Sequence, residues 1–161
     1  MSKAVFSLLV DNTSGVLSRI SGLFSRRGYN IDSLTVGVTE NPVYSRMTVV
    51  ATGDDEILEQ IHRQLEKLVD VIDIKKLESH TTAVCRELVL MKVGVEPEER
   101  EQVLAIVNIF RAKIVDVSED SMIVELTGSQ SKVDAFIRLI NGFTIREMAR
   151  TGITGLGRGS V

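Results

Sequence analysis

Four small or polar residues, Asn12, Thr13, Ser14 and Gly15, connect an apolar segment to the first amphipathic segment of the chain. A helix that begins here has amide groups without intrahelical partners, and its dipole favours an anion at this end. Gly15 has no Cβ, so a ligand can approach the backbone closely. The side-chain amides of Asn12 and Asn30 both donate and accept hydrogen bonds. The pattern suits a zwitterionic amino acid whose carboxylate meets the helix end.

The same residues also have a purely structural interpretation. Thr13 or Ser14 would be the N-cap of the helix, and Gly15 would be a turn residue. Asn30 would be a left-handed turn residue that follows the C-cap glycine, Gly28. Physical reasoning from the residues alone favours this interpretation and leaves the binding interpretation open.

Conventional catalytic chemistry has few candidates in this chain. A Ser–His–acid or Cys–His arrangement needs a positioned histidine, and the chain has two, His62 in a polar part of a predicted helix and His80 in a polar linker. Cys85 lies in an apolar segment, where a small core or interface residue is expected. The C-terminal "GITGLGRG" follows no strand–helix unit, so it fails the context test for a dinucleotide loop. We therefore predict no catalytic residue and no metal site.

The composition restricts the class of protein further. The chain has 161 residues, is 43% hydrophobic and carries a net charge of -3, which is typical of a globular protein. Basic residues are spread over both halves and there is no Trp, so a nucleic-acid partner is not expected. A single cysteine fits a reducing compartment. With no signal peptide and no long apolar run, we expect a cytoplasmic protein without a membrane partner.

Hydrophobic periodicity predicts the order βαββαβ in the first half of the chain. Apolar residues at helical spacing (Val16, Ile20, Leu23 and Phe24) predict a helix over 15–27 that ends at Gly28. The second helix begins in the acidic "TGDDE", which suits the helix dipole. The predicted strands are 3–10, 31–38, 44–51 and 69–77.

The second half repeats this order after a polar break at 78–83. A helix starts at Pro97, a residue favoured at the first helical position, and ends at Phe110. The other predicted elements are strands 84–95, 113–117, 122–126 and 143–148 and a helix over 129–140. The glycine-rich tail, 150–161, is expected to be loosely ordered.

The fold class is therefore α+β, with two tandem ferredoxin-like βαββαβ units over residues 1–78 and 79–161. Each unit should have a four-stranded antiparallel sheet with both helices on one face. Strands that are apolar on both faces need a cover on the other face, either from a neighbouring domain or from a second chain. We therefore expect an oligomer.

The opening residues resemble a known family. The stretch "DNTSGVLSRISGLFSRRGYNIDSLTV" is similar to the start of an ACT domain, a regulatory module that binds amino acids in dimers. Further stretches resemble the small, regulatory subunit of acetolactate synthase, also called acetohydroxyacid synthase. They are "YSRMTVV", "LEQIHRQLEKLVDVIDI", "CRELVLMKV" and "ARTGITGLGRG". The resemblance covers nearly the whole chain.

The resemblance implies an ACT regulatory domain over 1–78 and a C-terminal ferredoxin-like domain with a Gly-rich tail over 79–161. It implies a subunit that is not an enzyme on its own. Such a subunit binds and activates the catalytic large subunit and confers feedback inhibition by valine in branched-chain amino acid biosynthesis. Thiamine diphosphate, Mg and FAD belong to the catalytic partner, and this chain carries no cofactor.

By the same resemblance, valine binds at the interface of a homodimer. The contacts carried over by motif position are Asn12, Gly15, Val16 and Leu17 of one chain with Asn30 and Ile31 of the other, while Thr13 and Ser14 add backbone contacts. Leucine and isoleucine are further candidate effectors, because one methylene changes binding in an apolar pocket by only about 1–3 kcal/mol.

Three alternatives compete with this interpretation. One is an ACT-type amino-acid sensor for another enzyme. Another is a stand-alone enzyme on the same fold, but acylphosphatase-like catalysis needs an arginine in the first loop and "DNTSG" has none. The third is an RNA-binding module, which the scarcity of aromatic and clustered basic residues disfavours.

Overall fold

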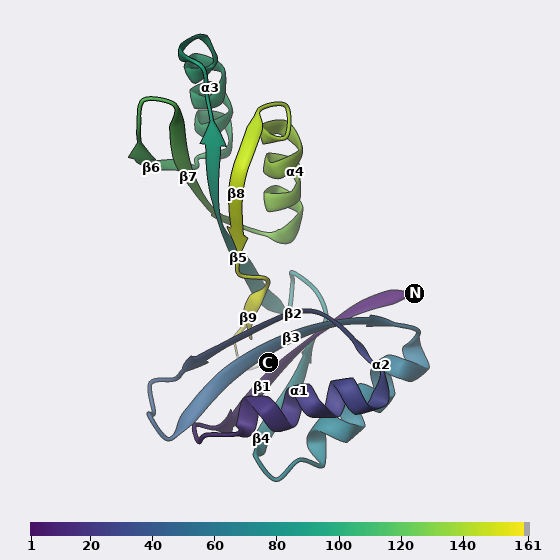
Figure 1. The fold of residues 1–161 in the computed structure, drawn as a ribbon. Coiled ribbons are helices and arrows are strands. Elements are labelled where there is room, and N and C mark those ends of the chain that lie inside the picture. The colour runs from purple at the N-terminus through teal and green to yellow at the C-terminus, as the bar shows by residue number, and fades with distance from the viewer. Residues whose placement is uncertain (160–161) are drawn as a thin grey trace. The chain divides into compact units, whose positions relative to one another are not determined.

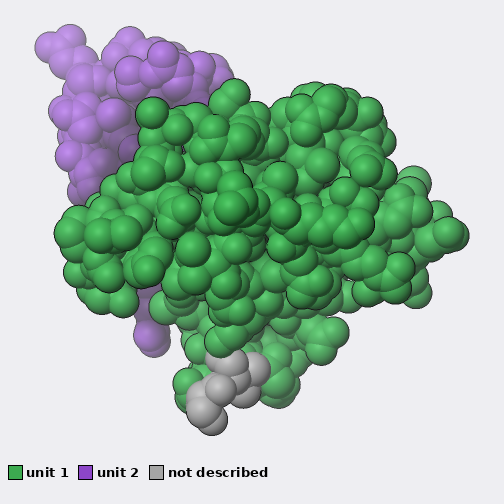
Figure 2. Space-filling view, turned by 90° about the horizontal axis from the view of Figure 1, so that it is seen from below, with its two compact units in different colours: residues 1–85, 152–161 green, residues 86–151 purple. Residues whose placement is uncertain are grey.

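The computed structural model describes residues 1–159 and divides into two compact units, coloured separately in Figure 2. The first unit contains residues 1–85 together with the C-terminal segment from residue 152, and the second contains residues 86–151. The expected division into 1–78 and 79–161 differs from this grouping. The reason is that the C-terminal segment bonds both to the first sheet and to the linker after residue 78.

The first unit has the predicted βαββαβ order. Its elements are β1 (Ser2–Asp11), α1 (Val16–Arg27), β2 (Asn30–Val38), β3 (Tyr44–Gly53), α2 (Asp55–Glu66) and β4 (Val71–Leu77). The strands form an antiparallel sheet in the order β2-β3-β1-β4, so β2 and β4 are its edges. Both helices lie on the same face of this sheet (Figure 1). The predicted α+β class and its ferredoxin-like arrangement are confirmed.

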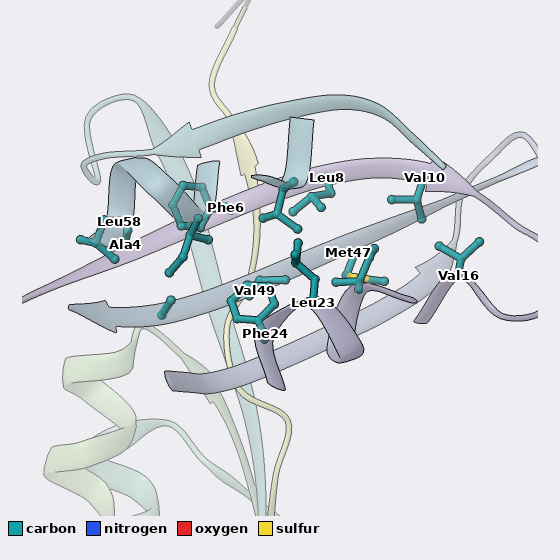
Figure 3. Packing of buried hydrophobic residues seen from close by; sticks show 14 residues of the cluster. Ala4, Phe6, Leu8, Val10, Val16, Leu23, Phe24, Met47, Val49 and Leu58 are labelled. Atoms are coloured by element: carbon teal, nitrogen blue, oxygen red, sulfur yellow. The ribbon is translucent and has the colours of Figure 1, made fainter. Parts of the chain in front are cut away.

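Local sequence explains where the two helices begin and end. In α1 the predicted apolar stripe is buried, and the helix ends at Gly28, whose left-handed backbone lets its amide bond to Phe24 and Ser25 carbonyls. In α2 the Asp54 carboxylate accepts a hydrogen bond from the Ile57 amide. Phe24 and Leu23 of α1 point toward Met47 and Val49 of the sheet, as Figure 3 shows.

The second unit repeats the order with its own core. Its elements are β5 (Ala83–Gly94), η1 (Pro97–Glu99), α3 (Arg100–Phe110), β6 (Lys113–Val117), β7 (Ser121–Gly128), α4 (Gln130–Ile140) and β8 (Thr144–Arg150). The four strands are antiparallel in the order β6-β7-β5-β8, and the first residues of β5 belong to the first unit. The helix predicted from Pro97 starts with a 3₁₀ turn, and the α-helix begins at Arg100. No helix within residues 1–159 has the length and apolar character that a membrane span requires.

The described part of the C-terminal tail is ordered, so the expectation of a loose tail is wrong there; residues 160–161 lie outside the described residues. It contains β9 (Thr154–Gly157), which pairs with β5. The tail lies on the face of the first sheet opposite α1 and α2 (Figure 1). There the Thr35 hydroxyl donates to the Ile153 carbonyl, and the Gly155 amide donates to the Thr48 hydroxyl.

Candidate functional site

The turn between β1 and α1 is tied to the β2–β3 connection by Asn12. The backbone amide of Asn12 donates to the Val43 carbonyl at 2.8 Å, and its side-chain amide donates to the Pro42 carbonyl at 3.0 Å. Its side-chain oxygen accepts a hydrogen bond from the Ser45 hydroxyl at 3.1 Å. Asn12 therefore fixes the turn, and its amide retains one further proton and one further lone pair for another partner.

The N-terminus of α1 has no side-chain cap in this structure. Gly15 is the N-cap residue with a φ of 90°, and neither Thr13 nor Ser14 bonds to the first-turn amides, so the structural N-cap interpretation is wrong. The first turn also has no acidic residue, whereas α2 has an Asp cap and two acids. Val16 is buried in the core, and Leu17 is 46% exposed. The amides at this helix end consequently face solvent with a positive potential.

An ion pair that the sequence analysis did not identify lies beside this turn. The Arg19 guanidinium donates from Nε and Nη2 to the two carboxylate oxygens of Asp70, at 2.6 and 3.0 Å. The Asp70 side chain is only 10% exposed, and hydrogen bonding from Arg19 lowers its pKa below the usual value. The same bond raises the pKa of Arg19. Arg19 is four residues after Gly15 and so one helical turn away, but nothing local in the sequence indicates Asp70.

Asn30 and Ile31 lie far from this turn within one chain. The strand register places Asn30 beside Thr52, and Thr52 beside Lys3 at the start of β1. Asn12 instead follows the last residue of β1, at the other end of the sheet. Asn12 is nine residues further along the chain than Lys3, so the two groups are separated by about 30 Å along the strand direction. One chain alone does not bring the predicted site residues together.

Two polar contacts hold the start of β2. The Asn30 side-chain amide donates to the Asp32 carboxylate at 3.2 Å, and the Thr52 hydroxyl donates to the same carboxylate. The outer side of β2 is a free sheet edge, and two apolar side chains on this strand, Val36 and Val38, are 49% and 62% exposed. An unpaired strand with exposed apolar residues is a ready template for another strand.

The three residues weighed for catalysis make contacts within the fold, and the contact of His80 is through its backbone. The His62 ring stacks on Phe6 with ring centroids 6.0 Å apart, and the His80 carbonyl accepts from Arg158. Cys85 is half-buried, and its sulfur lies 2.8 Å from where a Cβ on Gly155 would stand. Within residues 1–159 no three His, Cys, Asp or Glu side chains form a group that could hold a metal ion.

Two family models match the chain. A model described as the small subunit of acetolactate synthase matches residues 86–159, and one described as an AHAS small subunit-like ACT domain matches residues 6–73. Together they cover both βαββαβ units, including the tail that packs on the first sheet.

Relatives and a solved structure match over almost the full length. A probable acetolactate synthase small subunit from Methanothermobacter thermautotrophicus is 51% identical, with 97% of this chain and 93% of the relative covered. The acetolactate synthase isozyme 3 small subunit of Escherichia coli is 45% identical over 98% of this chain and 96% of its own length. The crystal structure of the Thermotoga maritima acetolactate synthase small subunit is 41% identical, covers 100% of both chains and superposes with a TM-score of 0.91. The chain belongs to the acetolactate synthase small-subunit family.

Proposed function

We propose that this chain is the regulatory subunit of an acetolactate synthase and that it confers feedback inhibition by valine. The observation that carries the proposal is the full-length match to acetolactate synthase small subunits. The chain would bind and activate the catalytic large subunit in the cytoplasm, without catalysing the reaction itself. Thiamine diphosphate, Mg and FAD would belong to the large subunit.

The first half of the proposed effector site is the open N-terminus of α1. Its first-turn amides have no side-chain cap, and Gly15 leaves the backbone accessible. A valine carboxylate placed here would satisfy these amides and interact favourably with the helix dipole. The exposed Leu17 side chain offers apolar contact beside them. The effector thus takes the place of the missing cap.

The second half of the site would come from another copy of the chain. A two-fold axis that pairs two β2 edges in antiparallel fashion also reverses the direction of α1 in the partner. The first turn of one α1 then lies near the partner's residues 30 and 31, which one chain holds at the opposite end of its sheet. The exposed Val36 and Val38 on β2 would be covered by the same pairing. An effector bound by both chains would stabilise the dimer, and the dimer would stabilise binding.

Isothermal titration of the purified chain with valine, leucine and isoleucine tests effector binding, and light scattering tests the dimer. We expect saturable binding of valine and a dimer mass. Adding the chain to a separately purified acetolactate synthase large subunit should raise its activity and make it sensitive to valine. A chain that binds none of the three amino acids and leaves large-subunit activity unchanged would contradict the proposal.

A mixed-dimer experiment tests whether two chains build each site. Gly15→Asp should repel the effector carboxylate, and Asn30→Ala should remove the contact from the other chain. Each variant alone would then lose valine binding. In a heterodimer, the substituted turn of the Gly15→Asp chain meets the substituted residue 30 of the Asn30→Ala chain, so both substitutions fall in one site. The other site contains the unchanged residues of both chains. Recovery of about half the binding stoichiometry is the expected result, and no recovery in a confirmed heterodimer would show that each site lies within one chain.

A further inference from the structure

The Arg19 side chain has one nitrogen that its ion pair leaves unused. Nε and Nη2 both face Asp70, and Nη1 points the other way, over the turn. Nη1 lies 2.9 Å from where a Cβ on Gly15 would stand. The guanidinium therefore lies beside the backbone that the proposed effector approaches, and a residue with a Cβ at position 15 would displace this nitrogen.

The surroundings of Nη1 favour an anion for an electrostatic reason. The N-terminus of α1 carries a partial positive charge, and the guanidinium adds a full positive charge of the same sign next to it. The Asp70 carboxylate compensates the guanidinium along the edge formed by Nε and Nη2, which leaves Nη1 without this compensation. The first turn contains no acid that could compensate the near side. A carboxylate between Nη1 and the amides would interact favourably with both.

Asp70 is well placed to hold this arrangement rigid. Its backbone carbonyl accepts a hydrogen bond from the Asp11 amide at 3.0 Å, so the residue also fixes the end of β1. Its carboxylate is largely buried and engages Arg19 through two bonds, which sets the plane of the guanidinium. One residue thus orients both sides of the turn at 12–15.

We propose that Arg19 contacts the carboxylate of the amino-acid effector through Nη1 and that Asp70 is the positioning residue for this contact. The inference rests on the proposed function and assigns the recognition of the carboxylate, the group that all three candidate effectors share. Arginine is required because its planar fork binds Asp70 and leaves a third nitrogen in a fixed direction. Lysine has one ammonium group and would have to divide it between the two carboxylates.

Valine titrations of three single variants test the proposal. Arg19→Gln should weaken valine binding about tenfold, which is the low end for a charge-assisted bond because half of the Arg19 side chain is exposed. Arg19→Lys should lose less affinity for valine than Arg19→Gln. Arg27→Gln is the matched control, since Arg27 lies on the same helix and, within residues 1–159, its side chain bonds only to Gln64; it should bind valine within twofold of the original chain.

Two further measurements separate a direct contact from a disturbed fold. The double variant Arg19→Gln, Asp70→Asn leaves no unpaired charge at this position, yet its affinity for valine should still be about tenfold lower than that of the original chain. Valinamide lacks the carboxylate, so its affinity, measured by competition, should be equal in the original chain and in Arg19→Gln. If valinamide does not bind the original chain, the valine affinity of the double variant alone decides whether Arg19 contacts the carboxylate.

The outcomes distinguish the two proposals. An original chain that binds no branched-chain amino acid overturns both the effector function and the Arg19 contact. An original chain that binds valine, together with an Arg19→Gln or double variant of the same affinity, overturns only the Arg19 contact. Equal losses for valine and valinamide would also overturn it, because the loss would then not involve the carboxylate.

Discussion

The contact between the C-terminal tail and the first sheet predicts a specific effect of Gly152→Ala. Gly152 has a φ of +83°, and a Cβ there would stand 2.5 Å from the Ser33 Cβ on β2. Ile153 follows directly, is buried, and accepts a hydrogen bond from Thr35. A methyl group at 152 must therefore displace either the backbone of β2 or the tail.

The expected loss of stability in Gly152→Ala is the sum of two free-energy costs, and it cannot exceed the free energy with which the tail binds the sheet. The left-handed backbone costs an L-residue about 1–2 kcal/mol, and overpacking by one methyl group typically costs about 1–3 kcal/mol. The limit is the free energy with which the tail binds the sheet, because the tail detaches once the cost exceeds it. Burying Ile153 contributes about 1.5–3 kcal/mol to that free energy. We therefore expect a loss of about 2–3 kcal/mol together with release of the tail.

Hydrogen exchange and limited trypsin digestion measure this release. The Gly155 and Arg158 amides, which bond to Thr48 and Thr82, should lose protection in Gly152→Ala, and cleavage after Arg158 should become faster. Gly159→Ala is the matched control, because Gly159 has a φ of +57° but nothing within 4 Å of its Cβ position.

Combining Gly152→Ala with Ser33→Gly should restore part of the protection, since it removes the atom that the new methyl group meets. Unchanged protection of the tail in Gly152→Ala, or a loss of protection of the same size in Gly159→Ala, would refute this account of how the tail is held.

Three further predictions concern the turn, the Arg19–Asp70 ion pair and a second ion pair in the second unit, in which Arg150 donates two hydrogen bonds to the Glu87 carboxylate. Gly15→Ala should weaken valine binding in titration calorimetry about tenfold, because its Cβ displaces Arg19; an unchanged affinity would contradict this placement of the effector. Arg150→Met should reduce the free energy of unfolding by about 3 kcal/mol in urea, because it leaves the Glu87 carboxylate, which is 4% exposed, without its bidentate partner. The double variant with Glu87→Gln should lose less, and an equal loss would show that the unpaired charge is not the cause. The pKa of Asp70 is lowered in the folded protein, so the ionised carboxylate stabilises the fold above its ordinary pKa of about 3.9, and this stabilisation is lost as the pH falls below that value. The difference in melting temperature between the original chain and Asp70→Asn should therefore shrink below about pH 4. A difference that stays constant with pH would show that ionisation of Asp70 does not stabilise the fold.

The helices and strands were predictable because their signals are local. The apolar stripe of α1 and the glycine after it specify both the buried face and the end of that helix. For α2 the acids of the first turn were recognised in the sequence, and periodicity predicts Ile57, Ile61, Leu65 and Leu68 on the buried face, whereas the structure buries Leu58, Ile61 and Leu65. Ile57 and Leu58 are neighbours, and periodicity alone does not fix the rotation of a helix to one residue.

The tail was misjudged because its order depends on tertiary contacts. Glycine-rich segments are intrinsically flexible, yet a Cβ at Gly155 would stand 2.9 Å from a Leu77 side-chain atom and 2.8 Å from the Cys85 sulfur. Gly155, one of the glycines that led to the expectation of a loosely ordered tail, is thus a residue that lets this backbone approach the sheet. Pairing of Asp70 with Arg19, 51 residues apart, was invisible for the same reason.

The docked tail also limits how a second copy can bind the first unit. An uncovered apolar sheet face was expected to require a neighbouring domain or another chain, but the chain covers much of this face itself. The backbone groups of the tail need partners there, and the buried Thr48 hydroxyl and the Thr35 hydroxyl supply them. On the sheet of the second unit, a hollow is lined by Leu90, Lys92, Ile123, Glu147, Met148 and Ala149. With much of the open face of the first sheet covered, the exposed apolar residues of this unit include Val36 and Val38 on β2 and Leu17 on α1, which the proposed two-chain effector site would use.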